Sequence, residues 1–275
     1  MASETKMSSD PDANDNVDMI EHVRTNASIA IPLEVFERRY LSLNIPNANW
    51  YKRLGNPTPL GLVGFLMAAS PFACALLGWG GAGGGGVATI GFSYFFGGVL
   101  QLIAAVLEFI LGSTFPSVVF GSFGAFWVAL GATQTPNFNA QAFFENGEND
   151  VDMSEYYASF AFGLIFLAVL VSIYTICATR LNIVFFCLSF TLTFSVICLA
   201  ASYWCMAQGK ALAGERLTKA GGSLLFIVCF LAWYYLVYLM LDCVNFPLNV
   251  PVGDLTRVYG RDKARNRECE GMDFP

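Results

Sequence analysis

Charged side chains are scarce in this sequence. Asp, Glu, Lys and Arg make up 13% of its 275 residues, whereas a soluble domain carries about 25%. Across residues 54–144 the only acidic or basic side chain is that of Glu108, and across residues 156–207 it is that of Arg180. A soluble fold cannot do without a charged surface over such lengths, and 55% of the residues are hydrophobic. We therefore predict an integral membrane protein.

Groups that bind metals or carry out catalysis are also rare. The only histidine is His22, and the eight cysteines form no Cys-x-x-Cys pair. Seven of the cysteines lie in or beside apolar segments, where cysteine usually serves as a small apolar residue. No nucleophile–base pair stands out, and the glycine run at residues 80–86 lacks the strand–turn–helix context of a phosphate-binding loop. We expect no metal, no other cofactor and no enzymatic activity.

The net charge of −6 comes mostly from one acidic loop at residues 133–155 and from the N-terminal end of the chain. No basic stripe is present, so we expect no nucleic-acid partner. Residues 1–54 lack the apolar core of a cleaved signal peptide and are typical of a disordered acidic tail.

Apolar segments long enough to span a bilayer recur along the chain. A hydrocarbon core of about 30 Å requires roughly 20 apolar residues in a helix. Six segments qualify: 59–79, 87–112, 115–132, 156–177, 182–207 and 220–243. The sequence therefore predicts an all-α membrane protein, with a tail at 1–54, a six-helix transmembrane domain at 55–244 and a second tail at 245–275.

The distribution of Lys and Arg predicts the orientation. An even number of spans puts both termini on one side, where Lys52, Arg53, Arg180 and several basic residues after the last span also fall. The opposite side carries the acidic loop and fewer basic residues. By the positive-inside rule, both termini are predicted to be cytoplasmic, in a multi-pass protein of the plasma membrane.

The first span begins at a polar, proline-containing motif, NPTPLGLVGF, at residues 56–65. Asn56 or Thr58 can cap the helix, and Pro59 suits its first turn, where a missing N–H costs nothing. Structural capping is one interpretation. The other is that the free N–H groups and partial positive charge at the helix start bind a carboxylate.

The motif resembles the NPAPLGL signature of the microbial acetate uptake transporter family, the acetate/succinate–proton symporters. Three further stretches resemble the family and its fungal branch in the same order: FSYFFGGVLQLIAAVLEFILGSTF at 92–115, SFGAFW at 122–127 and VPVGDL at 250–255. Thr58 stands where the signature usually has alanine, and Phe123 where many members have tyrosine.

The resemblance implies six transmembrane helices per protomer, a hexamer and a separate pathway through each protomer. It also implies a narrow hydrophobic constriction made by three side chains, for which the candidates are Phe65, Phe123 and Leu188. The assignment of Leu188 depends on the register chosen for the fifth span. The candidate substrate-binding residues are Asn56, Thr58, Leu60, Gln101 and Thr114.

Two polar residues of the second span allow more than one interpretation. Glu108 is a candidate for proton coupling, because an acid within a membrane span is usually functional. Alternatively, it lies close enough to the end of the span to reach interfacial water. Gln101 either faces the pathway or forms a hydrogen bond with a neighbouring helix, and we favour the latter.

We therefore predict a transporter for acetate and related short-chain monocarboxylates, coupled to protons, with membrane lipid and copies of the same chain as partners. The alternatives are a passive anion channel, an ammonium or ammonia pathway, and a nutrient-sensing membrane protein.

Overall fold

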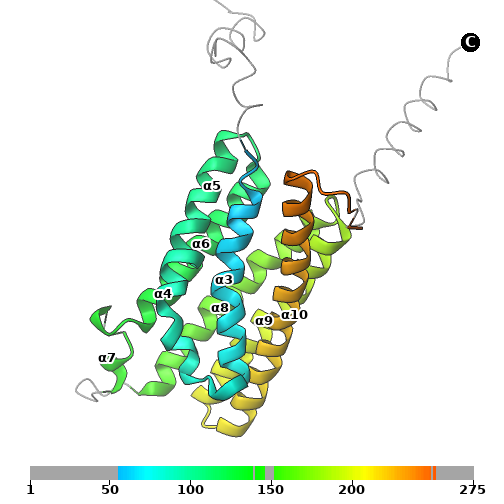
Figure 1. Ribbon diagram of the computed structural model, residues 1–275. Helices are drawn as coiled ribbons and strands as arrows, with labels where there is room; N and C mark the ends of the chain where they lie inside the picture. The colour runs from blue at the N-terminus through cyan, green and yellow to red at the C-terminus, as the bar shows by residue number, and fades with distance from the viewer. Residues whose placement is uncertain (1–54, 139, 146–151, 249, 252–275) are drawn as a thin grey trace, which may run out of the picture. The chain divides into compact units, whose positions relative to one another are not determined.

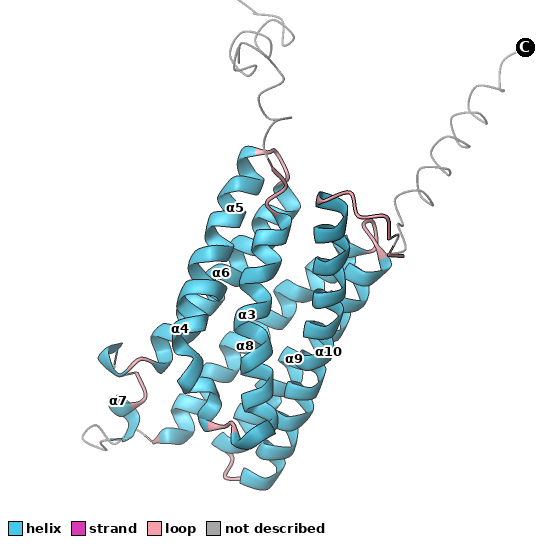
Figure 2. Ribbon diagram, in the orientation of Figure 1, coloured by secondary structure: helices cyan, strands magenta, loops and turns pink. Residues whose placement is uncertain are grey.

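The computed structural model describes residues 55–138, 140–145, 152–248 and 250–251. Within these residues the regular structure is helical, and no strand is present (Figure 2). The predicted tail at 1–54 and most of the predicted tail at 245–275 lie outside the described residues.

Six candidate membrane spans account for most of the described chain. The long helices are α3 (Thr58–Leu77), α5 (Gln101–Ile110), α6 (Thr114–Gln134), α8 (Met153–Ala178), α9 (Ile183–Ala207) and α10 (Ala211–Cys243) (Figure 1). Shorter elements are η3 (Trp79–Gly81), η4 (Gly84–Thr89), α4 (Ile90–Phe92), η5 (Ser93–Leu100), η6 (Pro136–Phe138) and α7 (Ala142–Glu145). The predicted six-span, all-α architecture is confirmed, and the first five spans lie within a few residues of their expected bounds.

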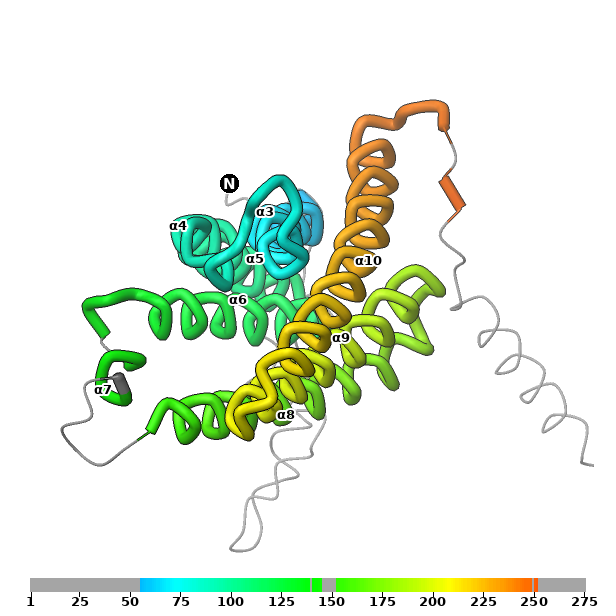
Figure 3. The backbone as a smooth tube through the Cα atoms, turned by 90° about the horizontal axis from the view of Figure 1, so that it is seen from below, coloured from blue at the N-terminus to red at the C-terminus, as the bar shows by residue number. Residues whose placement is uncertain are grey.

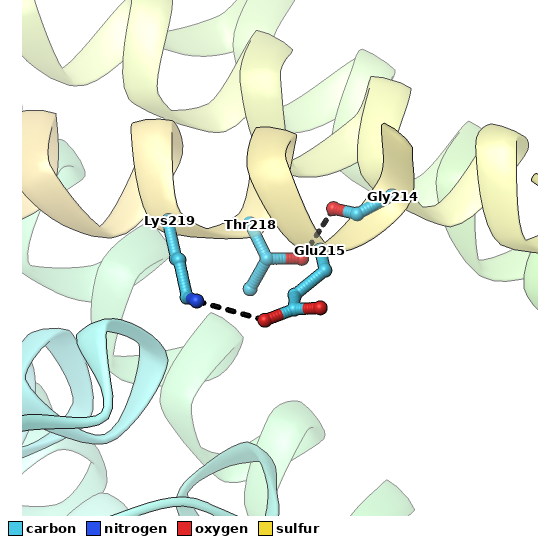
Figure 4. Close-up of polar contacts among 4 residues, drawn as sticks. All are labelled: Gly214, Glu215, Thr218 and Lys219. Atoms are coloured by element: carbon cyan, nitrogen blue, oxygen red, sulfur yellow. Dashed lines mark hydrogen bonds and ion pairs between the residues drawn. The ribbon is translucent and has the colours of Figure 1, made fainter. Parts of the chain in front are cut away.

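The last span begins nine residues before the predicted start. The prediction followed the apolar segment alone and placed the start at residue 220, whereas α10 begins at Ala211. Its first turns are polar and are held by local contacts (Figure 4): Lys219 Nζ lies 2.7 Å from Glu215 Oε1, and the Thr218 hydroxyl donates to the Gly214 carbonyl at 3.0 Å. Such pairs stabilise a helix without any apolar burial.

The glycine-rich connection between the first two spans is a tight turn, as expected. Gly78 ends α3 in the left-handed conformation, with φ of 76°, and its N–H bonds back to the last turn. Gly84, Gly85 and Gly86 also have positive φ values, which other residues adopt only at a cost. The chain therefore reverses within η3 and η4.

The second span is not a uniform α-helix. Its middle, η5, has the wider turns of a π-helix, a form that usually occurs in short pieces and often at functional sites. Gly97 and Gly98 lie in this segment against other spans: a Cβ on Gly97 would lie 2.5 Å from Cγ of Trp127, and one on Gly98 would lie 2.5 Å from Cγ2 of Val128. The absent side chains thus allow η5 to approach α6 closely.

The spans pack as two groups of three. The first group contains α3, the second span and α6, whereas α9 packs against both α8 and α10 in the second. Helix α10 also contacts α3, which joins the two groups (Figure 3). The buried apolar residues of all six spans form one continuous core.

Candidate functional site

Two cavities of about 40 Å³ each lie inside the six-helix unit. The glutamine cavity is lined by Gln101 together with residues of α3, α6, α8 and α9. The tryptophan cavity is lined by Trp127 together with residues of α3, α6, α8, α9 and α10. Both cavities are thus lined by helices of both groups. A water molecule needs roughly 10–15 Å³ by the same measure, so each cavity has room for a few small heavy atoms.

Three side chains line both cavities: Phe65, Phe123 and Leu192. The rings of Phe65 and Phe123 meet edge to face, with centroids 6.0 Å apart. Leu188, the third residue expected at the constriction, lies one helical turn before Leu192. It lines the glutamine cavity but not the tryptophan cavity. The structure therefore brings all three expected residues to one cavity and adds Leu192, which lines both cavities.

Sequence reasoning missed Tyr174 of α8, which lines the glutamine cavity. Its ring packs edge to face against Phe123, with centroids 6.3 Å apart, and its hydroxyl lies 3.0 Å from that of Ser122. The Ser122 hydroxyl is also placed to donate to the Val119 carbonyl, which leaves Tyr174 as the donor between the two hydroxyls. No local pattern could have singled out one tyrosine in an apolar helix.

In the side-chain amide of Gln101, the nitrogen has a hydrogen-bond partner among the described residues and the oxygen has none. Its side chain is 1% exposed, and Nε2 donates to the Gly61 carbonyl of α3 at 3.4 Å. The favoured interpretation, a hydrogen bond to a neighbouring helix, is therefore correct, but the residue also lines the cavity. Its Oε1 is buried and has no hydrogen-bond partner within the described part of the chain.

Glu108 and Thr58 form a second polar feature. The Glu108 side chain is 2% exposed, and its Oε1 accepts a hydrogen bond from the Thr58 hydroxyl at 2.5 Å. The expectation that this acid reaches interfacial water is not met within the protomer, because α5 turns it toward the start of α3. Neither residue lines the two cavities.

Residues at the start of α3 supply much of the hydrogen bonding that its first backbone N–H groups need. The helix begins at Thr58, with Pro57 in the capping position, and neither expected residue is the formal cap. Asn56 is exposed, and its Oδ1 accepts the Thr58 backbone N–H at 3.0 Å. The binding of a substrate carboxylate at this helix start stays a prediction.

The remaining candidates lie apart from the cavities. Leu60 packs against the core without lining either one, and Thr114 is exposed at the start of α6. Among the described residues, no three His, Cys, Asp or Glu side chains lie close enough to hold a metal ion.

Known proteins resemble this chain over most of its length. The sequence profile described as the GPR1/FUN34/yaaH family matches residues 42–257. "Protein alcS" of Aspergillus fumigatus is 43% identical over 239 residues, covering 85% of this chain and 88% of that protein. The "Acetate transporter protein patA" of Aspergillus clavatus is 34% identical over 214 residues, covering 78% of this chain and 83% of that protein.

A solved structure shares the fold. The structure described as that of the bacterial acetate channel SatP superposes with a TM-score of 0.57, at 23% identity, over 73% of this chain and 100% of that chain. The motif resemblance, the matched profile and the two fungal relatives therefore agree. The six spans identify a multi-pass membrane protein, and this chain belongs to the GPR1/FUN34/yaaH family.

Proposed function

We propose that this protein moves acetate and related short-chain monocarboxylates across a membrane, through the two cavities inside its six-helix unit. The observation that carries the proposal is that Phe65, Phe123 and Leu192 line both cavities, as expected of a hydrophobic constriction along one pathway. A ring of apolar side chains suits a substrate whose tail is a methyl group. The fungal relative named as an acetate transporter supports the same substrate class.

The proposal includes proton coupling through Glu108. This acid is buried against α3 and bonded to Thr58, whose hydroxyl is its hydrogen-bond donor. Changing Glu108 to Gln keeps the shape and removes the exchangeable proton. The variant should lose accumulation driven by a pH gradient and keep downhill exchange of acetate. Equal loss of both would assign Glu108 a structural role.

We also propose a membrane location, an orientation and an oligomeric state for the protein. The distribution of basic residues supports cytoplasmic termini, and the membrane that we propose is the plasma membrane. Many large apolar side chains face outward, such as Phe95 and Phe109 of the second span, which are 70% and 72% exposed. Lipid and other copies of the chain would cover such surfaces, and the family resemblance supports a hexamer.

Uptake of radiolabelled acetate into proteoliposomes tests the function. The full-length protein should give saturable uptake above that of protein-free vesicles, and a pH gradient, inside alkaline, should increase accumulation. Protein-containing vesicles that take up no more acetate than protein-free vesicles would refute the proposal.

A further inference from the structure

Tyr174 reaches across the glutamine cavity from one group of helices to the other. Its helix, α8, packs mainly against α9, whereas α6 packs mainly against the second span. Helices α6 and α8 therefore meet through side chains at this cavity rather than by close packing along their length. One of these contacts is polar, because the Tyr174 hydroxyl lies 3.0 Å from that of Ser122 and donates to it. This bond links α8 to α6 beside the constriction.

The Tyr174 ring belongs to a row of aromatic rings that includes two residues of the constriction. It packs edge to face against Phe123, with centroids 6.3 Å apart, and Phe123 packs in the same way against Phe65 at 6.0 Å. Tyr174 also meets Phe115 edge to face, at 6.0 Å. Aromatic pairs prefer this geometry and are stabilised by it. The position of the Tyr174 ring therefore limits where the Phe123 ring can lie.

The hydroxyl of Tyr174 fixes the position of its ring. Its acceptor, Ser122, directly precedes Phe123 in α6 and is itself held by its bond to the Val119 carbonyl, at 3.0 Å. Tyr174 is 5% exposed, and a buried hydroxyl without a partner is unfavourable. Movement of the ring away from Ser122 would leave the hydroxyl in that state. A phenylalanine in the same place would lack this restraint.

We propose that Tyr174 is a positioning residue for the constriction. By its bond to Ser122 it holds the Phe123 ring against Phe65, and so limits the size of the monocarboxylate that passes. This inference rests on the proposed function and adds to it a pair of residues, from α8 and α6, that determines specificity. The hydroxyl of Tyr174 acts without touching the substrate, because its hydrogen is donated to the protein.

Two single variants break the same bond at different structural cost. Tyr174→Phe keeps the ring and leaves Ser122 bonded to the Val119 carbonyl, so it should melt close to the wild type. Ser122→Ala leaves the buried Tyr174 hydroxyl without its acceptor, so it should melt lower. In proteoliposomes, both full-length variants should raise the ratio of butyrate uptake to acetate uptake by a similar factor. We expect about two- to tenfold, the usual range for the net contribution of one hydrogen bond.

The double variant tests whether the two residues act through one bond. Tyr174→Phe combined with Ser122→Ala should show the uptake ratio of either single variant rather than the product of their factors. Tyr94→Phe is the matched control, because its hydroxyl lies 3.2 Å from that of Thr135 and it lines neither cavity. This control should keep the wild-type ratio.

Tyr174→Phe decides the matter even if Ser122→Ala yields no folded protein. A wild-type uptake ratio in Tyr174→Phe would overturn the inference while leaving acetate transport intact. Multiplied factors in the double variant, or an equal change in Tyr94→Phe, would also overturn it. Wild-type protein that takes up neither acid would instead overturn the proposed function itself.

Discussion

At the scale of single residues, Phe65 gives the most direct prediction about selectivity. Its ring lines both cavities and packs against Phe123. Phe65→Ala removes one wall of the constriction and should increase the uptake of bulkier monocarboxylates, such as butyrate, relative to acetate. The space left by the removed ring should also lower the free energy of unfolding by about 3–5 kcal/mol. The yield of folded protein must therefore be measured alongside uptake. Phe95→Ala, at a side chain that is 70% exposed, controls for loss of a phenyl ring. Unchanged selectivity in folded Phe65→Ala protein would remove this residue from the pathway.

The side chain of Thr58 makes a structural contact that the sequence alone did not reveal. Its hydroxyl bonds to the buried carboxylate of Glu108, and leaving such a group without its donor costs about 1–3 kcal/mol. Thr58→Ala should therefore lower the melting temperature of the purified protein, by about 2–4 °C per kcal/mol for a chain of this size. Thr58→Ser keeps the hydroxyl and should melt like the wild type. Equal melting of the alanine variant would show that the bond contributes nothing.

At the scale of helices, the close contact of η5 with α6 depends on Gly97. A Cβ there would lie 2.5 Å from Trp127 and 2.9 Å from Cβ of Ala68 in α3. Gly97→Ala should therefore separate the second span from both neighbours and lower the melting temperature. Gly91→Ala is a matched control, because its Cβ would meet nothing within 4 Å. If both variants melt like the wild type, the close packing of this span is not essential to the fold.

Sequence patterns located the helices better than they located the site. Apolar length alone identified all six spans, since the bilayer fixes the length of a spanning helix. It missed the first nine residues of α10, where a pair between Glu215 and Lys219 replaces apolar burial. It also missed the wide turns of η5, the segment in which Gly97 packs against Trp127.

The candidate site was only partly predictable for a related reason. Family resemblance pointed to Phe65, Phe123 and Leu188, all of which line one cavity. Leu192 and Tyr174 were missed because an apolar helix has no periodic signal that separates a cavity-facing side chain from a packed one. The bond between Thr58 and Glu108 joins residues 50 positions apart, and only the tertiary fold brings them together.

At the scale of the whole molecule, the even number of spans predicts that both ends of the chain lie on the same side of the membrane. Reporter groups fused to either terminus should be inaccessible from outside intact cells, because the basic residues near the ends predict a cytoplasmic location. Protease protection of the two fusions measures this. Accessibility of one terminus alone would contradict the count of six spans, and accessibility of both would reverse the orientation.

The central claim is that acetate passes through the interior of the six-helix unit, where Leu192 lines both cavities. The most direct measurement is labelled acetate uptake by Leu192→Trp protein in proteoliposomes. Overpacking costs about 1–3 kcal/mol, so equal amounts of folded protein must be compared. Ile197→Trp, on the same helix at a side chain 41% exposed, controls for adding an indole to α9. The account predicts that Leu192→Trp takes up acetate no faster than protein-free vesicles, whereas Ile197→Trp matches the wild type. Folded Leu192→Trp protein that transports acetate at the wild-type rate would contradict it.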